Sequence, residues 1–161
     1  MQGYNERILR QLLGIYEKIM LTEDEALLKG YFSDLSRTEM HTLTMIGPYE
    51  KPSMGETAQK LNITTGTLTV AINRLVRKKY VTRSSSEEDR RLVLLSLTRK
   101  GKVAFRIFWR FHTRLVDGMT EGLTEEQKTL FEDALSYIDR YITDEYNKYS
   151  EREVRNNDEE R

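Results

Sequence analysis

Apolar side chains recur at intervals of three and four residues along most of the chain, which predicts a mainly helical protein. The first helix is predicted over residues 4–22, where Ile8, Leu12 and Ile19 belong to a wide apolar stripe. A stripe this wide indicates burial on more than one side of the helix, as at a subunit interface.

Capping boxes mark where three later helices begin. In this pattern a Ser or Thr precedes a Glu or Gln by three residues, and the two side chains satisfy backbone amides at the helix start. It occurs at Ser36, Ser53 and Thr124. The helix opened at Ser36 is predicted to be short, because Gly47 and Pro48 follow it.

The middle of the chain predicts two helices joined by a tight turn. The helix opened at Ser53 ends near Leu61, and Asn62 tolerates the left-handed backbone that such a turn needs. Thr64 can cap the next helix, predicted over residues 65–79.

The hydrophobic period then changes to that of strands. Residues 80–83 and 92–97 are strand-like, and the polar segment 84–91 between them predicts a β-hairpin with a long tip. Thr98 can cap a long helix to about Val116, followed by a break over 118–123. The expected fold class is mainly α with a small β-wing, a winged helix-turn-helix centred on residues 53–98.

Charge is unevenly distributed, although the 161-residue chain has no net formal charge. Residues 74–102 contain ten basic and three acidic side chains, whereas residues 117–161 contain six basic and fourteen acidic ones. A concentrated basic surface attracts the phosphates of nucleic acid, and counterion release supplies affinity. The acidic end is expected to face away from DNA.

A basic run alone is usually a solvated face without a ligand. Here it coincides with helix-turn-helix spacing, with short polar side chains on the exposed side of the second helix, and with a basic hairpin. Together these features predict binding to double-stranded DNA. The candidate DNA contacts are Ser53, Thr64, Thr65, Thr67, Thr69, Asn73, Arg74, Arg77, Arg83, Asp89, Arg90, Arg91 and Lys100.

Four segments make residues 53–101 resemble the MarR family of bacterial regulators. They are residues 61–69, 74–83, 86–91 and 97–101, and they include an acidic-x-Arg wing followed by a Leu-Thr-x-x-Gly helix start. The six-helix layout extends the resemblance to roughly residues 4–147. It implies a homodimeric repressor of a palindromic operator.

The resemblance also implies roles for parts of the chain. Residues 1–150 are expected to form one family-like unit, followed by a frayed polar tail over residues 151–161. Within that unit, residues 36–101 form the DNA-binding region, and residues 4–35 and 102–150 supply the dimerisation helices. Arg91 enters the minor groove, and Asp89 holds the wing by pairing with an arginine, with Arg77 as the candidate. Lys79 stands where the family usually has glycine before the first wing strand.

Residues 39–43, 46–47 and 66–69 further resemble the branch of the family that represses fatty-acid synthesis genes. That branch uses acyl chains carried on acyl carrier protein as corepressor. A lipophilic ligand needs an apolar lining. The candidate lining residues are His41, Phe105, Phe108, Trp109 and His112, although the aromatic ones fit a dimer core equally well.

Alternative functions depend on fewer residues. A zinc-responsive regulator is the first, because a zinc-uptake branch of the family has histidines near the positions of His41 and His112. Only the carboxylates of residues 23–25 are at hand to complete the set of three or four ligands that zinc needs, so no metal and no cofactor are expected. A regulator responding to a small lipophilic or aromatic compound is the second alternative.

Other classes of protein have little support. The chain contains no cysteine, no phosphate-binding glycine motif and no metalloprotease motif, so an enzyme is not expected. Neither a membrane-spanning segment nor a signal peptide is apparent, which favours a cytoplasmic protein. The alternative of another class is a helical dimerisation or ligand-binding module without DNA function.

Overall fold

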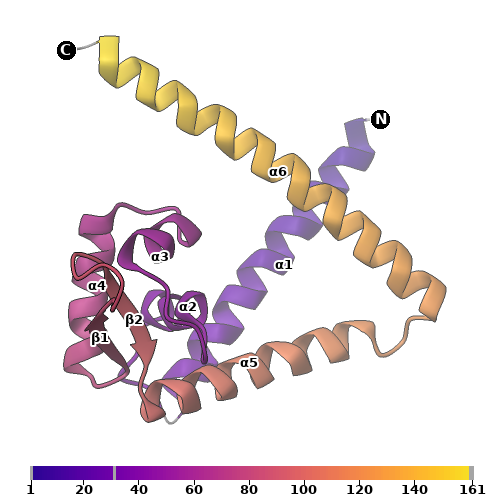
Figure 1. Ribbon diagram of the computed structural model, residues 1–161. Helices are drawn as coiled ribbons and strands as arrows, with labels where there is room; N and C mark the ends of the chain where they lie inside the picture. The colour runs from indigo at the N-terminus through magenta and orange to yellow at the C-terminus, as the bar shows by residue number, and fades with distance from the viewer. Residues whose placement is uncertain (1, 31, 160–161) are drawn as a thin grey trace. The chain divides into compact units, whose positions relative to one another are not determined.

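The computed structural model describes residues 2–30 and 32–159 of the chain. These residues divide into two compact units, with the boundary between residues 111 and 112. The elements in chain order are α1 (Gln2–Leu28), α2 (Arg37–Ile46), α3 (Met54–Lys60), α4 (Thr65–Arg77), β1 (Val81–Ser85), β2 (Val93–Leu97), α5 (Arg99–Thr120) and α6 (Glu125–Glu159) (Figure 1).

The hydrophobic core lies in the first unit, where α2, α3, α4 and the β-hairpin come together (Figure 1). Each element contributes the apolar positions of one face, as the periodicity predicts. The completely buried large side chains include Met40, Leu43, Ile46, Leu68, Ile72, Leu75, Tyr80, Val81 and Leu95.

Helix α1 is longer than the predicted 4–22 and continues to Leu28. Residues 22–25 interrupt the apolar period with four polar side chains, which hides the continuation of the helix to the core residue Leu27. Contacts with α2 also hold this part of the helix. The Arg37 guanidinium of α2 forms ion pairs with Asp24 and with Glu23, the latter at 3.7 Å, and donates to the Met20 carbonyl oxygen at 3.1 Å.

The predicted capped starts of α2, α3 and α4 are confirmed. Ser36 and Ser53 form complete capping boxes, and Thr64 accepts a hydrogen bond from the Thr67 backbone N–H. Asn62 has the expected left-handed backbone, with φ of 52°, in the turn between α3 and α4. These caps fix the helix-turn-helix locally, because each satisfies backbone amides that the helix itself leaves unpaired.

The hairpin is antiparallel, with Val81 opposite Leu97 and Ser85 opposite Val93. Both strands are displaced slightly from the predicted 80–83 and 92–97. The segment before α3 joins the hairpin's edge, since the Leu95 backbone N–H donates to the Pro52 carbonyl oxygen at 2.8 Å. This pairing attaches the wing to the helix-turn-helix.

The junction between α4 and β1 uses unusual backbone geometry. Helix α4 ends at Arg77, before the predicted residue 79, because Lys79 adopts a left-handed φ of 63°. That conformation explains why a glycine is usual at this position in the family that the sequence resembles. Nearby, Gly101 of α5 approaches the Tyr80 carbonyl so closely that a Cβ atom would overlap its oxygen.

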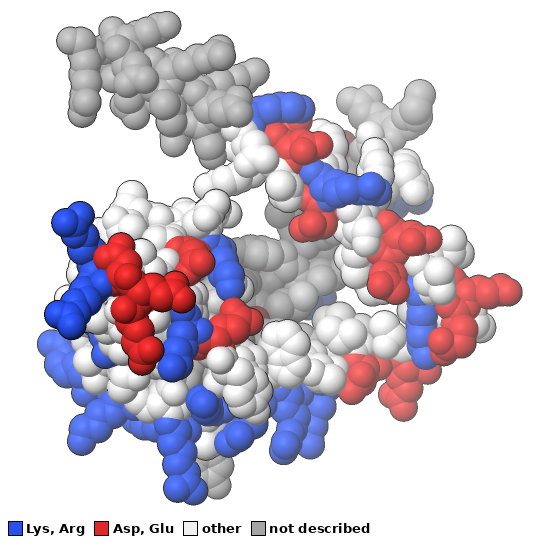
Figure 2. Space-filling model, in the orientation of Figure 1, with Lys and Arg blue, Asp and Glu red and all other residues white. Residues whose placement is uncertain are grey.

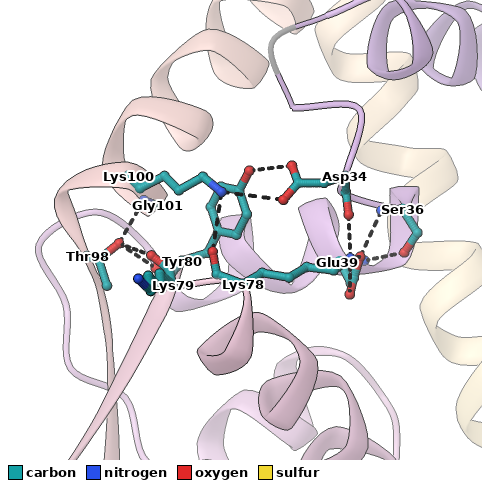
Figure 3. A network of polar contacts seen from close by, with 9 residues as sticks. All are labelled: Asp34, Ser36, Glu39, Lys78, Lys79, Tyr80, Thr98, Lys100 and Gly101. Atoms are coloured by element: carbon teal, nitrogen blue, oxygen red, sulfur yellow. Dashed lines mark hydrogen bonds and ion pairs between the residues drawn. The ribbon is translucent and has the colours of Figure 1, made fainter.

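A network of polar contacts surrounds Tyr80 (Figure 3). The Tyr80 hydroxyl donates to Asp34 Oδ1 at 2.6 Å, and Lys100 Nζ lies 3.4 Å from Asp34 Oδ2 and 3.9 Å from the centre of the Tyr80 ring. Lys78 Nζ donates to the Glu39 carboxylate at 2.7 and 2.9 Å and to the Asp34 carbonyl oxygen. The network thereby joins the segment before α2 to the end of α4 and the start of α5.

Ionisation equilibria in the network follow from these contacts. Burial acts to raise the pKa of Glu39, but hydrogen bonds from Lys78 and from the Ser36 backbone outweigh it, and the pKa falls below its ordinary value of 4.5. Burial likewise opposes ionisation of Asp34, yet the Tyr80 hydroxyl and Lys100 lower its pKa. Burial and the neighbouring carboxylates raise the pKa of Tyr80, so the phenol stays protonated and remains a donor.

The second unit contains the end of α5 and the whole of α6. The predicted end of the long helix near Val116 is wrong, because α5 continues to Thr120 with Gly118 inside it, and a helical glycine is unfavourable but tolerated. The capping box at Thr124 and Gln127 is confirmed. Helix α6 is helical to Glu159, within the predicted tail of 151–161, and residues 160–161 lie outside the described residues.

Over the described ranges, every helix is too short or too polar to span a membrane.

The close approach of Gly101 to Tyr80 predicts that Gly101→Ala lowers the free energy of unfolding by about 2 kcal/mol, because the methyl group meets backbone rather than a movable side chain. Gly118→Ala in the same helix is the matched control, since its Cβ would meet nothing within 4 Å. It should stabilise the protein by up to about 1 kcal/mol through helix propensity. Urea unfolding measures both, and equal effects of the two substitutions would contradict the packing.

The Glu39–Lys78 pair predicts a second effect. Lys78→Met should lower the free energy of unfolding by about 3 kcal/mol near neutral pH, because it leaves a buried carboxylate without its cation. Lys128→Met, which removes an exposed ion pair with Glu125, should cost less than about 1 kcal/mol.

The pH dependence has a defined sign. In the unmodified protein the lowered pKa of Glu39 provides stability above pH 4.5 that is lost as pH falls through the folded-state value. In Lys78→Met, burial raises the pKa of Glu39, so the carboxylate takes up a proton as the pH falls. The difference in free energy of unfolding between the variant and the unmodified protein should therefore become smaller in acid. A difference in free energy of unfolding that stays constant from pH 7 to pH 4 would contradict this account.

Candidate nucleic-acid interface

Helix α4 presents one apolar and one polar face. Leu68, Ile72 and Leu75 are completely buried at spacings of four and three. The predicted contact residues Thr65, Thr67, Thr69, Asn73, Arg74 and Arg77 are all exposed on the other side. Their exposure follows from the helical period, which places them away from the core. The outward face is therefore accessible to a DNA groove.

The hydroxyl groups on this face are partly engaged. Thr69 Oγ1 donates to the Thr65 carbonyl oxygen at 2.7 Å, and Thr64 Oγ1 lies 2.9 Å from Thr67 Oγ1. A hydroxyl whose hydrogen is used in this way still has oxygen lone pairs to accept with. Thr69 is thus placed to accept rather than to donate.

Val70 also lies on the outward face, with 53% of its surface exposed. The sequence did not mark it as a contact residue, because the short polar and basic side chains of the helix are the ones typical of DNA contacts. The signal was present: Val70 falls outside the stripe of Leu68, Ile72 and Leu75, so an amphipathic helix leaves it unburied. An apolar side chain in the major groove suits the methyl group of thymine.

The wing carries four of the predicted residues. Arg83 of β1 donates to Asn73 Oδ1 of α4 at 2.9 Å. Asp89 Oδ1 accepts from the Arg91 backbone N–H at 2.9 Å and forms no ion pair with any described residue, so the expected pairing with Arg77 is wrong. The carboxylate instead shapes the tip of the wing and leaves the Arg90 and Arg91 side chains exposed.

The basic side chains fall into two groups. Lys78 and Lys100 belong to the internal network, while Lys102 lies 5.4 Å from the centre of the Tyr49 ring. Among the described residues, no ion pair neutralises Arg74, Arg77, Lys79, Arg90, Arg91 or Arg99. Figure 2 shows basic side chains gathered around the part that holds α4 and the hairpin, with acidic ones in front of it.

Ser53 and Lys100, two of the predicted DNA contacts, have partners within the protein. The Ser53 hydroxyl accepts from the Glu56 backbone N–H at 3.1 Å, the Ser53 N–H donates to Glu56 Oε2 at 2.7 Å, and the residue is buried. Lys100 is held by Asp34 and by the Lys78 carbonyl oxygen. Ser53 thus caps α3, and Lys100 stabilises the start of α5, through contacts within the protein alone.

An apolar cavity of about 100 Å³ lies in the first unit. Its lining residues are Ala26, Leu27, Gly30, Phe32, Met40, Ile107, Phe108 and Phe111. Of the five predicted lining residues it includes Phe108 but not the others. Phe105 stacks on Trp109 with 5.7 Å between ring centres, His41 is exposed on α2, and His112 belongs to the second unit.

The carboxylates considered for a zinc site have other contacts. Asp24 and Glu23 lie beside the Arg37 guanidinium. Three or more His, Cys, Asp or Glu side chains do not gather into a potential metal site anywhere in residues 2–30 and 32–159.

Comparisons with known proteins agree with this architecture. The model of the MarR family matches residues 35–93. The crystal structure of Streptococcus pneumoniae FabT in complex with DNA is 34% identical to this chain, with a TM-score of 0.82, and the match covers 86% of this chain and 97% of that one. YfiV of Bacillus subtilis, an uncharacterised HTH-type transcriptional regulator, is 28% identical over 86% of this chain and 89% of its own length.

A more distant structure shows the same fold. The Staphylococcus aureus MepR–DNA complex has a TM-score of 0.66 at 20% identity, covering 80% of this chain and 93% of that one. The family and the relatives are transcription regulators rather than enzymes. The family match, the FabT likeness and the winged helix-turn-helix geometry together show that the chain belongs to the MarR family of DNA-binding transcription regulators.

Proposed function

We propose that this regulator represses transcription by occupying a palindromic operator as a homodimer. The observation that supports the proposal most directly is the outward face of α4, which carries polar side chains and arginines that no described residue neutralises. Two such helices in a symmetric dimer enter successive major grooves, about one helical turn apart. The symmetry of the dimer then requires a palindromic site.

The proposed roles differ among the predicted contact residues. Thr64, Thr65, Thr67, Thr69 and Asn73 contact base edges or phosphates in the major groove, and Arg74 and Arg77 contact the flanking phosphates. Arg90 and Arg91 at the wing tip serve the adjacent minor groove, where arginine is favoured by the negative potential. Ser53, Asp89 and Lys100 act indirectly, by holding the helix start, the wing tip and the start of α5 in place.

The proposed dimer interface uses the helices in residues 4–35 and 102–150. Many large apolar side chains remain exposed on α1, α5 and α6 within the single chain. Apolar residues scattered singly over a surface are ordinary, but a set this large indicates an interaction surface. The set includes Leu9, Leu12, Leu13, Val116, Met119, Phe131, Leu135, Ile138 and Ile142. A second copy of the chain buries such faces, and apolar burial is the main source of dimer stability.

We further propose a role in fatty-acid biosynthesis, with an acyl chain on acyl carrier protein as corepressor. The motifs in residues 39–47 and 66–69 and the likeness to FabT support this branch of the family. The apolar cavity between α1, α2 and α5 is a candidate site for the end of the chain, because its lining has almost no polar surface. A small lipophilic effector would use the same cavity.

Operator titrations separate these possibilities. Addition of acyl carrier protein loaded with a long acyl chain should tighten operator binding, whereas the unloaded carrier should not. A response to the free fatty acid alone would favour the small lipophilic effector instead. Weak binding to every duplex, without salt dependence, would favour a helical module without DNA function.

Arg91→Ala should weaken operator binding and lower the slope of log affinity against log salt by about 1, because one cation is lost from the DNA interface. The oligomeric state should not change, since Arg91 is in the wing. Fluorescence anisotropy over a salt series measures the affinity, with Lys128→Ala of α6 as the control. An affinity equal to that of the unmodified protein would contradict the proposed role of Arg91.

Val70 makes a separate prediction about bases. If its side chain contacts a thymine methyl group, replacing that thymine by deoxyuridine should weaken binding about fourfold, the value of one buried methyl group. Val70→Ala should abolish the difference between the two duplexes. Each thymine of the half-site is replaced in turn. The contact would be refuted if no replacement weakened binding of the unmodified protein more than that of Val70→Ala.

A further inference from the structure

The Asn73 and Arg83 side chains meet between the DNA-facing helix and the wing. Arg83 Nη1 donates to Asn73 Oδ1 at 2.9 Å across the boundary between α4 and β1, which lie side by side (Figure 1). Both ends of this contact have firm supports. Asn73 follows the buried Ile72, and Arg83 is paired across the hairpin with the buried Leu95.

Chemistry determines which way the Asn73 amide is turned. A guanidinium group has N–H donors and no acceptor, so only the amide oxygen can face it. The amide nitrogen, with its two N–H donors, lies on the opposite side of the same planar group. The two N–H donors of the Asn73 amide have no partner among the described residues, whereas its oxygen already accepts from Arg83.

This orientation bears on how bases are recognised. The ordinary contact of asparagine with adenine is bidentate, in which the amide N–H donates to N7 and the amide oxygen accepts from the N6 amino group. The oxygen keeps a second lone pair, but Arg83 fixes the plane of the amide and competes with the N6 amino group for the oxygen. The acceptor half of that contact is therefore weakened, whereas the donor half remains. Adenine and guanine both present N7, so the donor half of the contact does not separate them.

We propose that Arg83 is a specificity-determining residue that restricts Asn73 to donating to a purine N7. Asn73 then distinguishes purines from pyrimidines at one position of the half-site and accepts adenine and guanine alike. Arg83 is a positioning residue in this proposal and touches no base. The inference rests on the proposed placement of α4 in the major groove.

Four proteins provide the test: the unmodified chain, Arg83→Met, Arg83→Lys and Asn73→Ala. Met removes the donor and keeps a long side chain, whereas Lys keeps a donor and should preserve the unmodified behaviour. Affinities are measured at fixed salt for operators carrying every single base-pair substitution. A second set replaces each purine with its 7-deaza analogue, which removes only N7.

The position read by Asn73 is the one at which the 7-deaza analogue weakens binding of the unmodified protein but not of Asn73→Ala. There the unmodified protein and Arg83→Lys should bind adenine and guanine within about twofold. Arg83→Met should prefer adenine by about fivefold or more, because the freed amide oxygen can accept from N6. Dimerisation and the circular dichroism spectrum should be the same for all four proteins.

Three results would overturn the proposal. One is an adenine preference in the unmodified protein that Asn73→Ala removes, which would show that Arg83 releases the amide on binding. The second is an identical base profile for Arg83→Met and the unmodified chain. The third is the absence of any position that depends on Asn73. Failure of the unmodified chain to prefer any operator over random duplex would instead count against the proposed function itself.

Discussion

Tyr80 connects four parts of the DNA-binding region. Its backbone N–H donates to the Leu75 carbonyl oxygen at the end of α4, and its own carbonyl oxygen accepts from the Thr98 backbone N–H, both at 2.9 Å. Its buried ring lies edge-on to Phe32, with 6.1 Å between centres, and its hydroxyl donates to Asp34. A single buried residue therefore sets the end of α4, the start of β1 and the start of α5 relative to the segment before α2.

The same region explains why so many basic side chains occur together. Lys78 and Lys100 stabilise the carboxylates around Tyr80, and Arg83 orients Asn73. The exposed arginines at the end of α4 and at the wing tip are the ones left to attract phosphate. The number of basic side chains in the region is thus a poor guide to which residues contact DNA. Some of these side chains form contacts within the protein that hold the DNA-facing elements in place.

Local features were predictable from the sequence, since they depend on neighbouring residues. The caps at Ser36, Ser53 and Thr64 and the left-handed turn at Asn62 all follow from side chains within a few positions. The hairpin followed from the change of hydrophobic period, although its strands are displaced slightly from the predicted ranges.

Contacts between distant residues were not predictable from the sequence. The Tyr80–Asp34 bond joins positions 46 residues apart, and Lys100 reaches Asp34 across 66 residues. No local pattern marks such pairs, which is why the sequence predicts Lys100 as a DNA contact and Asp89 as a partner of Arg77. The cavity shows the same limit: Phe32 and Met40, far from α5 in sequence, line it together with Phe108, whereas the neighbouring Phe105 stacks on Trp109.

The central claim is that α4 and the wing form one DNA-contacting surface, held in place from behind by the Tyr80 network. Amide hydrogen exchange with and without an operator duplex tests it most directly. We expect the duplex to slow exchange in residues 64–77 and 84–93 and to leave residues 125–149 of α6 unchanged. Slowing confined to α6, or none in α4 and the wing at a saturating duplex concentration, would contradict the account.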